Sequence, residues 1–104
     1  MSIQKFNSHQ ITQAIQNIKG WALEPDESFM NKQWQFDSFK TAMEFIAKVA
    51  EIAERHNHHP EFLSVYRKMR VRLSTHDASG LTQKDFDLAA AIDGLIECQF
   101  NHRI

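Results

Sequence analysis

The chain has 104 residues, of which 42% are hydrophobic, and 12 Lys+Arg face 13 Asp+Glu, so its formal net charge is −1. That length suits one compact domain over residues 1–104, and the apolar content suffices for a core. The balanced charge gives no support to direct nucleic-acid binding, which depends on a basic face. Cys98 is the single cysteine, so no intrachain disulfide can form.

The start of the chain, MSIQKFNSHQ, has no basic segment followed by an apolar one, the pattern of a secretory signal. No run of about 18 apolar residues exists, the length that a membrane-spanning helix needs. We therefore expect a cytoplasmic protein that does not enter a membrane. A small enzyme for polar substrates and a protein-binding module are both open at this point.

The first predicted element is a helix between residues 8 and 20. Its apolar residues recur at the spacing of one helix face: Ile11, Ala14, Ile15 and Ile18. Ser8 is a candidate N-cap, and Gly20 stands where such a helix ends. This pattern predicts a helix with one face toward a core.

Two strands are expected next. Trp21–Glu24 predicts a short strand, and Pro25–Ser28 supplies the chemistry of a turn. From Met30 to Phe36 apolar and polar residues alternate, except at Lys32, which is typical of a half-buried strand. Strands joined by such a short loop pair antiparallel.

Residues 38–56 give the strongest helix pattern in the sequence. Its apolar stripe consists of Ala42, Phe45, Ile46, Val49, Ile52 and Ala53. Ser38 and Thr41 are candidate N-caps. The helix must end near His59, because Pro60 disfavours the helical conformation for the residue before it.

A hairpin and a third helix complete the chain. Residues 61–76 predict two strands with a turn near Arg67–Lys68. Thr82 is the expected N-cap of the last helix, with Asp85 in the position of a capping box. The order of elements predicts an α+β fold, a four-stranded antiparallel sheet with three helices packed on one face.

The histidines are the most informative residues for function, because three of the six lie in the stretch AERHNHHPEF. The predicted hairpin returns His76 to the edge of the sheet where His58 and His59 lie. Imidazoles with a pKa of about 6.5 can both accept and donate protons near neutral pH. The sequence shows no activated serine or cysteine motif and no glycine-rich phosphate loop. The pattern therefore favours proton transfer without a covalent intermediate or a nucleotide.

Two other interpretations of the histidines are open. His56, His58, His59 and His76 could nominally supply the three or four ligands that zinc requires. Adjacent histidines such as His58 and His59 rarely both reach one ion, however, and no H-E-x-x-H pattern is present, so we expect no metal site. Alternatively, these residues are solvated side chains at a helix C-terminus, where the helix dipole favours a protonated imidazole.

The segment HNHHPEFLSVYRKMRVRLSTHDASGLTQKDFDLAAAID resembles the signature region of the pterin-4a-carbinolamine dehydratase family. The matching residues are Glu54, His58, His59, Pro60, Glu61, Val65, Tyr66, Thr75, His76, Gly80, Leu81, Thr82, Asp85, Leu88, Ala89, Ile92 and Asp93. The combination of H-H-P-E, T-H and G-L-T is specific, whereas H-H-P alone is weak. The resemblance covers nearly the whole chain and implies the same fold as the predicted elements.

The resemblance implies dehydration of 4a-hydroxytetrahydropterin to quinonoid dihydropterin, in tetrahydrobiopterin recycling and linked to an aromatic amino acid hydroxylase. It implies catalysis by His58, His59 and His76, without a metal or an organic cofactor. The pterin-binding residues that it implies are His58, His59, Pro60, Thr75, His76, Asp77 and Ala78. We assign His58 and His76 to proton transfer and His59 mainly to placing the hydroxyl group. Glu54, Lys84 and Asp85 are expected to support the site.

The sequence departs from the family pattern at three positions near the expected site. Phe62 stands where tryptophan is usual, Lys84 stands where arginine is common, and Ser79 replaces a frequent glycine or alanine. Lysine and arginine are not equivalent in planar recognition. None of these changes removes a histidine, so they bear on substrate preference more than on activity.

The resemblance also implies a homodimer or homotetramer, and the two exposed edges of a four-stranded sheet favour pairing. Two alternative functions remain. Animal relatives in this family resemble dimerisation cofactors of a homeodomain transcription factor, so the chain could be a protein-binding module, and it could also be a catalytically silent homologue. Glu44, Lys48, Glu51 and Glu54 make the outer face of the second helix polar, which disfavours the module.

Overall fold

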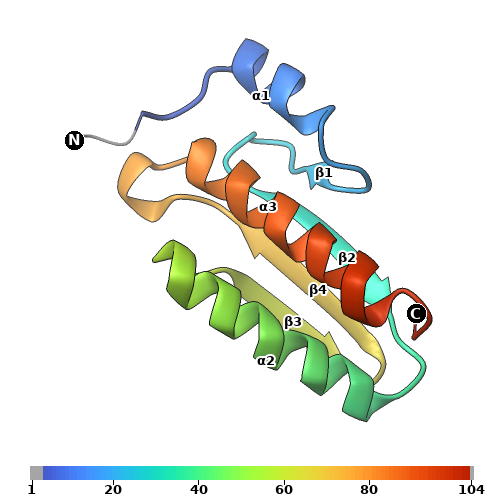
Figure 1. Cartoon of the computed structure of the whole chain (residues 1–104). Helices are drawn as coiled ribbons and strands as arrows, with labels where there is room; N and C mark the ends of the chain where they lie inside the picture. Colours follow the sequence, from blue (N-terminus) through green and yellow to red (C-terminus); the bar gives the residue numbers. More distant parts are fainter. Residues whose placement is uncertain (1–3, 104) are drawn as a thin grey trace.

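The computed structural model describes residues 4–103 and shows an α+β fold, three α-helices and a four-stranded antiparallel sheet (Figure 1). The helices are α1 (Ser8–Ile15), α2 (Phe39–His56) and α3 (Gln83–Leu95). The strands are β1 (Ala22–Leu23), β2 (Met30–Gln35), β3 (Glu61–Val65) and β4 (Lys68–Leu73). A 3₁₀ turn, η1 (His76–Ala78), precedes α3, and a π-helical turn, η2 (Ile96–Phe100), extends it. The predicted fold class is confirmed.

The sheet has the strand order β1-β2-β4-β3, and every neighbouring pair is antiparallel. β2 and β4 pair at the centre from Met30↔Leu73 to Gln35↔Lys68, while β3 pairs with β4 at one edge. Glu61, the first residue of β3, lies opposite Arg72 near the end of β4. Consequently the segment that enters β3 lies beside the segment that leaves β4.

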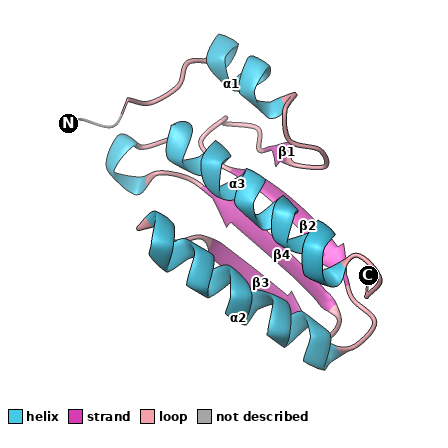
Figure 2. Cartoon of the chain, in the orientation of Figure 1, coloured by secondary structure: helices cyan, strands magenta, loops and turns pink. Residues whose placement is uncertain are grey.

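The helices α2 and α3 lie side by side across one face of the sheet (Figure 2). The strand residues that face them are buried, and they are Met30, Trp34, Met69, Val71 and Leu73. An aromatic group joins the sheet to the helices, because the ring of Phe45 lies 5.0 Å from those of Trp34 and Phe36. Ile11 of α1 belongs to the same apolar core. The assignment of residues 1–104 to a single domain stays a prediction.

Each α-helix begins directly after a residue whose side chain accepts a hydrogen bond from the first turn of the helix. The Thr41 amide donates to Ser38 Oγ at 3.1 Å, which makes Ser38 the N-cap of α2. Thr82 and Asp85 form the capping box predicted for α3. The expected N-cap of α1 is wrong, because Asn7 rather than Ser8 caps it, and α1 ends at Ile15, short of residue 20.

Candidate active site

The candidate site lies between two turns, one directly after α2 and one after β4. Asn57 adopts a left-handed conformation (φ 49°) directly after α2, and the His58 amide donates to Ala53 O at 3.0 Å. On the other side, Thr75 pairs with Gly80 as an isolated bridge, which closes the loop that contains η1. His76 therefore lies in η1 and not on the extended β4 where the sequence pattern had placed it.

A hollow of about 260 Å³ lies between these two turns. It is lined by Asn57, His58, His59, Thr75, His76, Asp77 and Lys84, and we call it the histidine hollow. Most of the residues predicted from the sequence therefore share one concave surface. Four of the predicted residues do not line it: Glu54 and Pro60 line a neighbouring apolar hollow, Ala78 is the last residue of η1, and Asp85 is buried beneath His58.

His58 is held by a buried carboxyl group. Its Nε2 lies 2.6 Å from Asp85 Oδ1, and the two residues are 8% and 0% exposed. The other oxygen, Asp85 Oδ2, accepts hydrogen bonds from Thr75 Oγ1 at 2.8 Å and from the Thr82 amide at 2.9 Å. The carboxyl group is thus fixed at both oxygens, and it fixes the imidazole in turn.

This network also assigns the proton on the His58 ring. A carboxylate has no hydrogen to donate, so His58 Nε2 must carry the proton that lies between it and Asp85 Oδ1. In the neutral form of this ring, Nδ1 is then the nitrogen with a lone pair, able to accept a proton. The sequence had indicated Asp85 as a supporting residue, and the structure places it in direct contact with the predicted catalytic imidazole.

The other two histidines are held less firmly. His59 Nε2 lies 3.0 Å from Glu54 Oε2, with side chains that are 62% and 75% exposed. Such an exposed pair contributes little to stability. His76 is also exposed. The site therefore combines one fixed, buried imidazole with two that solvent and ligands can reach.

Asn57 lines the histidine hollow, but the sequence analysis did not name it as a site residue. A signal was available, because asparagine tolerates the left-handed conformation and often follows the last residue of a helix. An asparagine directly before H-H-P would have indicated both the end of α2 and the rim of the hollow.

An ion-pair network borders the site on the open face of the sheet. Arg72 donates to Glu24 Oε1 at 2.6 Å and to Glu61 Oε1 at 3.0 Å, and its guanidinium lies 4.0 Å from the ring centroid of Phe29. The hydrogen bond from Arg72 lowers the pKa of Glu24, and the hydrogen bond to Glu24 raises the pKa of Arg72. This network fixes the start of β3 against the loop before β2.

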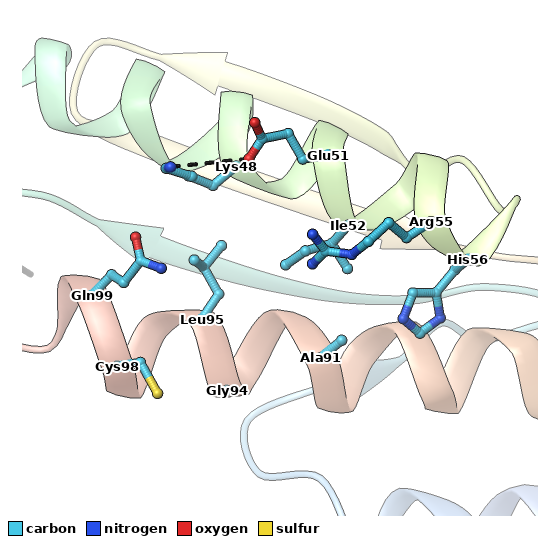
Figure 3. A pocket seen from close by; sticks show the side chains of 10 residues that line it. All are labelled: Lys48, Glu51, Ile52, Arg55, His56, Ala91, Gly94, Leu95, Cys98 and Gln99. Atoms are coloured by element: carbon cyan, nitrogen blue, oxygen red, sulfur yellow. Dashed lines mark ion pairs between the residues drawn. The ribbon is translucent and has the colours of Figure 1, made fainter.

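A larger hollow, about 450 Å³, lies elsewhere, between α2 and the helical segment α3–η2 (Figure 3). Lys48, Glu51, Arg55 and His56 line it from α2, and Cys98 lines it from η2. None of the site residues predicted from the sequence lines this larger hollow, so the volume of a hollow does not by itself identify the candidate active site.

Two further findings concern residues 4–103. In this part of the chain no three His, Cys, Asp or Glu side chains are grouped so that they could hold a metal ion. Over the same residues, none of the helices has the length and apolar character needed to cross a membrane.

The fold and the site define a class of protein, a small α+β domain with three histidines at one hollow. The family model for pterin 4 alpha carbinolamine dehydratase matches residues 4–95. The chain belongs to this family, as the sequence resemblance predicted.

Known proteins agree with this assignment. A Sinorhizobium fredii protein named "Putative pterin-4-alpha-carbinolamine dehydratase" is 43% identical over 93 residues, covering 89% of each chain. A protein of the same name from Roseiflexus castenholzii is 43% identical over 90 residues, 86% of this chain and 95% of its own.

Solved structures show the same architecture. A crystal structure described as a transcriptional coactivator/pterin dehydratase from Brucella melitensis has a TM-score of 0.84 at 27% identity, covering 88% of this chain and 98% of its own. A pterin dehydratase-like protein identified as a RuBisCO assembly factor in the alpha-carboxysome has a TM-score of 0.63 at 19% identity, covering 73% of this chain and 88% of its own. The second likeness shows the fold alone.

Proposed function

We propose that this protein dehydrates 4a-hydroxytetrahydropterins in the cytoplasm, as part of tetrahydrobiopterin recycling linked to an aromatic amino acid hydroxylase. In this reaction the C4a–O bond breaks, the hydroxyl group takes up a proton and leaves as water, and N5 loses its proton. The new C4a=N5 double bond gives the quinonoid dihydropterin. One acid and one base near neutral pKa are sufficient for this exchange.

The observation that carries the proposal is the pairing of His58 with Asp85 at the histidine hollow. A buried carboxyl group that fixes one imidazole beside two accessible ones is suited to proton transfer, in addition to capping the start of α3. We assign proton transfer to His58 and His76, and placement of the leaving hydroxyl group to His59. The pterin ring would then lie against the turns at residues 58–60 and 75–78.

The direct test is a dehydration assay with 4a-hydroxytetrahydropterin, followed by the absorbance of the quinonoid product. We expect His76→Ala to slow turnover by about 10²–10⁴-fold, the usual worth of a positioned acid or base. His9→Ala, which changes an exposed residue of α1, is the control and should keep full activity. A folded His76→Ala protein with wild-type turnover would refute the shared site.

We also propose that the protein forms a homodimer or homotetramer. The edge strand β3 and the turn after it carry four exposed large hydrophobic side chains: Phe62 57%, Leu63 57%, Val65 57% and Tyr66 69%. An edge strand with unpaired backbone groups and apolar side chains is a site at which chains pair. This strand is therefore the surface at which we expect a second copy.

The alternative function, a protein-binding module, would be favoured by an apolar outer face on α2. The observed outer face is polar, since Lys48 and Glu51 have side chains that are 50% and 66% exposed and lie 4.0 Å apart. Glu44 pairs with Arg103 at 2.6 Å, which keeps another charge on this helix. These side chains favour a solvated helix and support the enzymatic proposal.

A further inference from the structure

His76 forms part of the wall of two separate hollows. It lines the histidine hollow, and it also lines a second hollow of about 340 Å³ on the open face of the sheet. We call the second one the hydroxyl hollow, because Ser28, Ser74 and Ser79 line it together with Asp26 and Glu61. Its polar lining contrasts with the neighbouring apolar hollow, which shares His59 with the histidine hollow.

Two hydrogen-bonded groups hold the walls of the hydroxyl hollow in place. The carboxyl group of Asp26 accepts a hydrogen bond from the Ser28 amide at 3.0 Å. Opposite, Arg72 binds Glu61 at 3.0 Å and packs on the ring of Phe29, which also lines the hollow. Asp26 lies in the loop between β1 and β2 and Glu61 begins β3, and the two carboxyl groups make this hollow unfavourable for an anion.

Ser79 provides an independent sign that the hydroxyl hollow is used. It has a left-handed backbone (φ 58°), which disfavours residues with a Cβ and favours glycine. Its amide bonds His76 O at 3.0 Å, so the backbone is held in this conformation. A strained serine whose side chain borders a hollow suggests that the hydroxyl group serves a purpose there.

The chemistry of the substrate connects the two hollows. C4a, which carries the leaving hydroxyl group, and C6 are both bonded to N5, so the C6 substituent must leave the site beside the groups that exchange protons there. We propose that His76, which borders both hollows, lies along this edge of the pterin ring, and that the hydroxyl hollow receives the C6 substituent and selects an uncharged, hydroxylated chain over an anionic one. Asp26 and Ser79 are the specificity-determining residues. This inference rests on the proposed dehydratase function.

The test compares the 4a-hydroxy forms of three tetrahydropterins, which carry a methyl group, a dihydroxypropyl chain or a phosphate ester of that chain at C6. The measured quantity is kcat/KM. Asp26→Asn should raise the value for the phosphate ester about fivefold, the worth of one exposed charge pair. Ser79→Gly should lower the value for the dihydroxypropyl substrate about fivefold, the worth of one neutral hydrogen bond. The value for the methyl substrate, which has no group to enter the hollow, is the reference against which both changes are expressed as selectivity ratios.

Two control variants complete the design. Asp87→Asn removes a carboxyl group from the exposed face of α3, where it bonds Gln83 at 2.9 Å, and should leave all three values unchanged. Phe62→Ala opens the neighbouring apolar hollow, where the substituent would lie if His59 rather than His76 bordered it. Ser79→Gly should also unfold at a temperature no lower than the wild type, because glycine relieves the left-handed strain.

The outcomes separate this inference from the function on which it rests. If Asp26→Asn and Ser79→Gly turn over the methyl substrate and keep the wild-type ratios of kcat/KM among the three substrates, the inference about the hydroxyl hollow is wrong and the dehydratase proposal stands. Selectivity that shifts with Phe62→Ala instead would overturn it in favour of the apolar hollow. A folded wild-type protein that turns over none of the three substrates would refute the dehydratase proposal and this inference together.

Discussion

Replacing Asp85 with asparagine would test whether the carboxyl group sets the proton position on His58. Asparagine has nearly the same shape, so the change alters hydrogen-bond character more than packing. The Thr82 amide can only donate, so the asparagine oxygen must stay on that side, where Asp85 Oδ2 now lies at 2.9 Å. The asparagine NH₂ group must then face His58 Nε2, now 2.6 Å from Asp85 Oδ1.

Two donors cannot share that position, so Nε2 of His58 must become the acceptor and the proton must move to Nδ1. The nitrogen that we expect to act as the base would then carry a proton in the resting protein. We expect Asp85→Asn to lower kcat by about 10²–10⁴-fold, comparable to loss of the acid–base group itself. The free energy of unfolding should fall by only about 1–3 kcal/mol, since charge-assisted hydrogen bonds become neutral ones.

The measurement combines the dehydration assay with ¹⁵N chemical shifts of the His58 ring, which distinguish the two tautomers. Asp85→Ala serves as the comparison, because it leaves the His58 ring, Thr75 and the Thr82 amide without their buried acceptor. It should cost about 3 kcal/mol or more in stability. If Asp85→Asn inverts the tautomer and keeps wild-type turnover, Nδ1 of His58 is not the base.

Three further predictions concern the histidines, the Glu24–Arg72 pair and the edge strand β3. Combining His58→Ala with His76→Ala should raise the free energy of activation by less than the sum of the two single increases, because residues that act as a unit are non-additive. Strict additivity of the two increases, measured from kcat, would contradict the shared site. The pKa of Glu24 is lowered by Arg72 from its ordinary value of 4.5, so the stability that Glu24 contributes is present above pH 4.5 and is lost as the pH falls through the lowered pKa. In chemical denaturation, the free energy of unfolding of the wild type should therefore be larger than that of Glu24→Gln at pH 7, and the two values should converge in acid. A difference between them that grows in acid would show that ionised Glu24 does not stabilise the fold. Light scattering at high micromolar concentration should report an oligomer, and a single species of 12.1 kDa would contradict pairing at β3.

The sheet could be predicted from the sequence because its signals are local. Alternation along Met30–Phe36 and along residues 69–73 follows directly from side chains that point to opposite faces of a strand. The register of β3 on β4 then follows from the short turn, which brings residues 58–60 beside residues 74–76. This is why the approach of His76 to His58 and His59 could be expected before the structure was known.

Other features depend on contacts that a linear pattern does not contain. Asn7 caps α1 through a reciprocal bond with Gln10, whereas Ser8 is used differently and donates to Glu27 at 2.5 Å. The turn between β3 and β4 begins at Tyr66, one residue earlier than expected, because Tyr66 adopts the left-handed conformation (φ 53°). The hydroxyl hollow could not be predicted either, since its walls come from the β1–β2 loop, the start of β3 and the segment after β4, which only the folded sheet brings together.

Two left-handed residues that flank the segments lining the histidine hollow, Asn57 and Ser79, have a consequence for ligand affinity. Asn57 and Ser79 stand at opposite ends of the segments that form its walls, and hydrogen bonds from their amides to Glu54 O at 3.1 Å and His76 O at 3.0 Å hold each turn closed. A flat ligand would thus bind to turns whose backbone conformation is already fixed, and no loop would have to become ordered. The entropy lost on binding would fall on the ligand, on the exposed side chains of His59 and His76, and on the half-buried side chain of Lys84. A site preorganised in this way can bind a small, rigid molecule with few contacts.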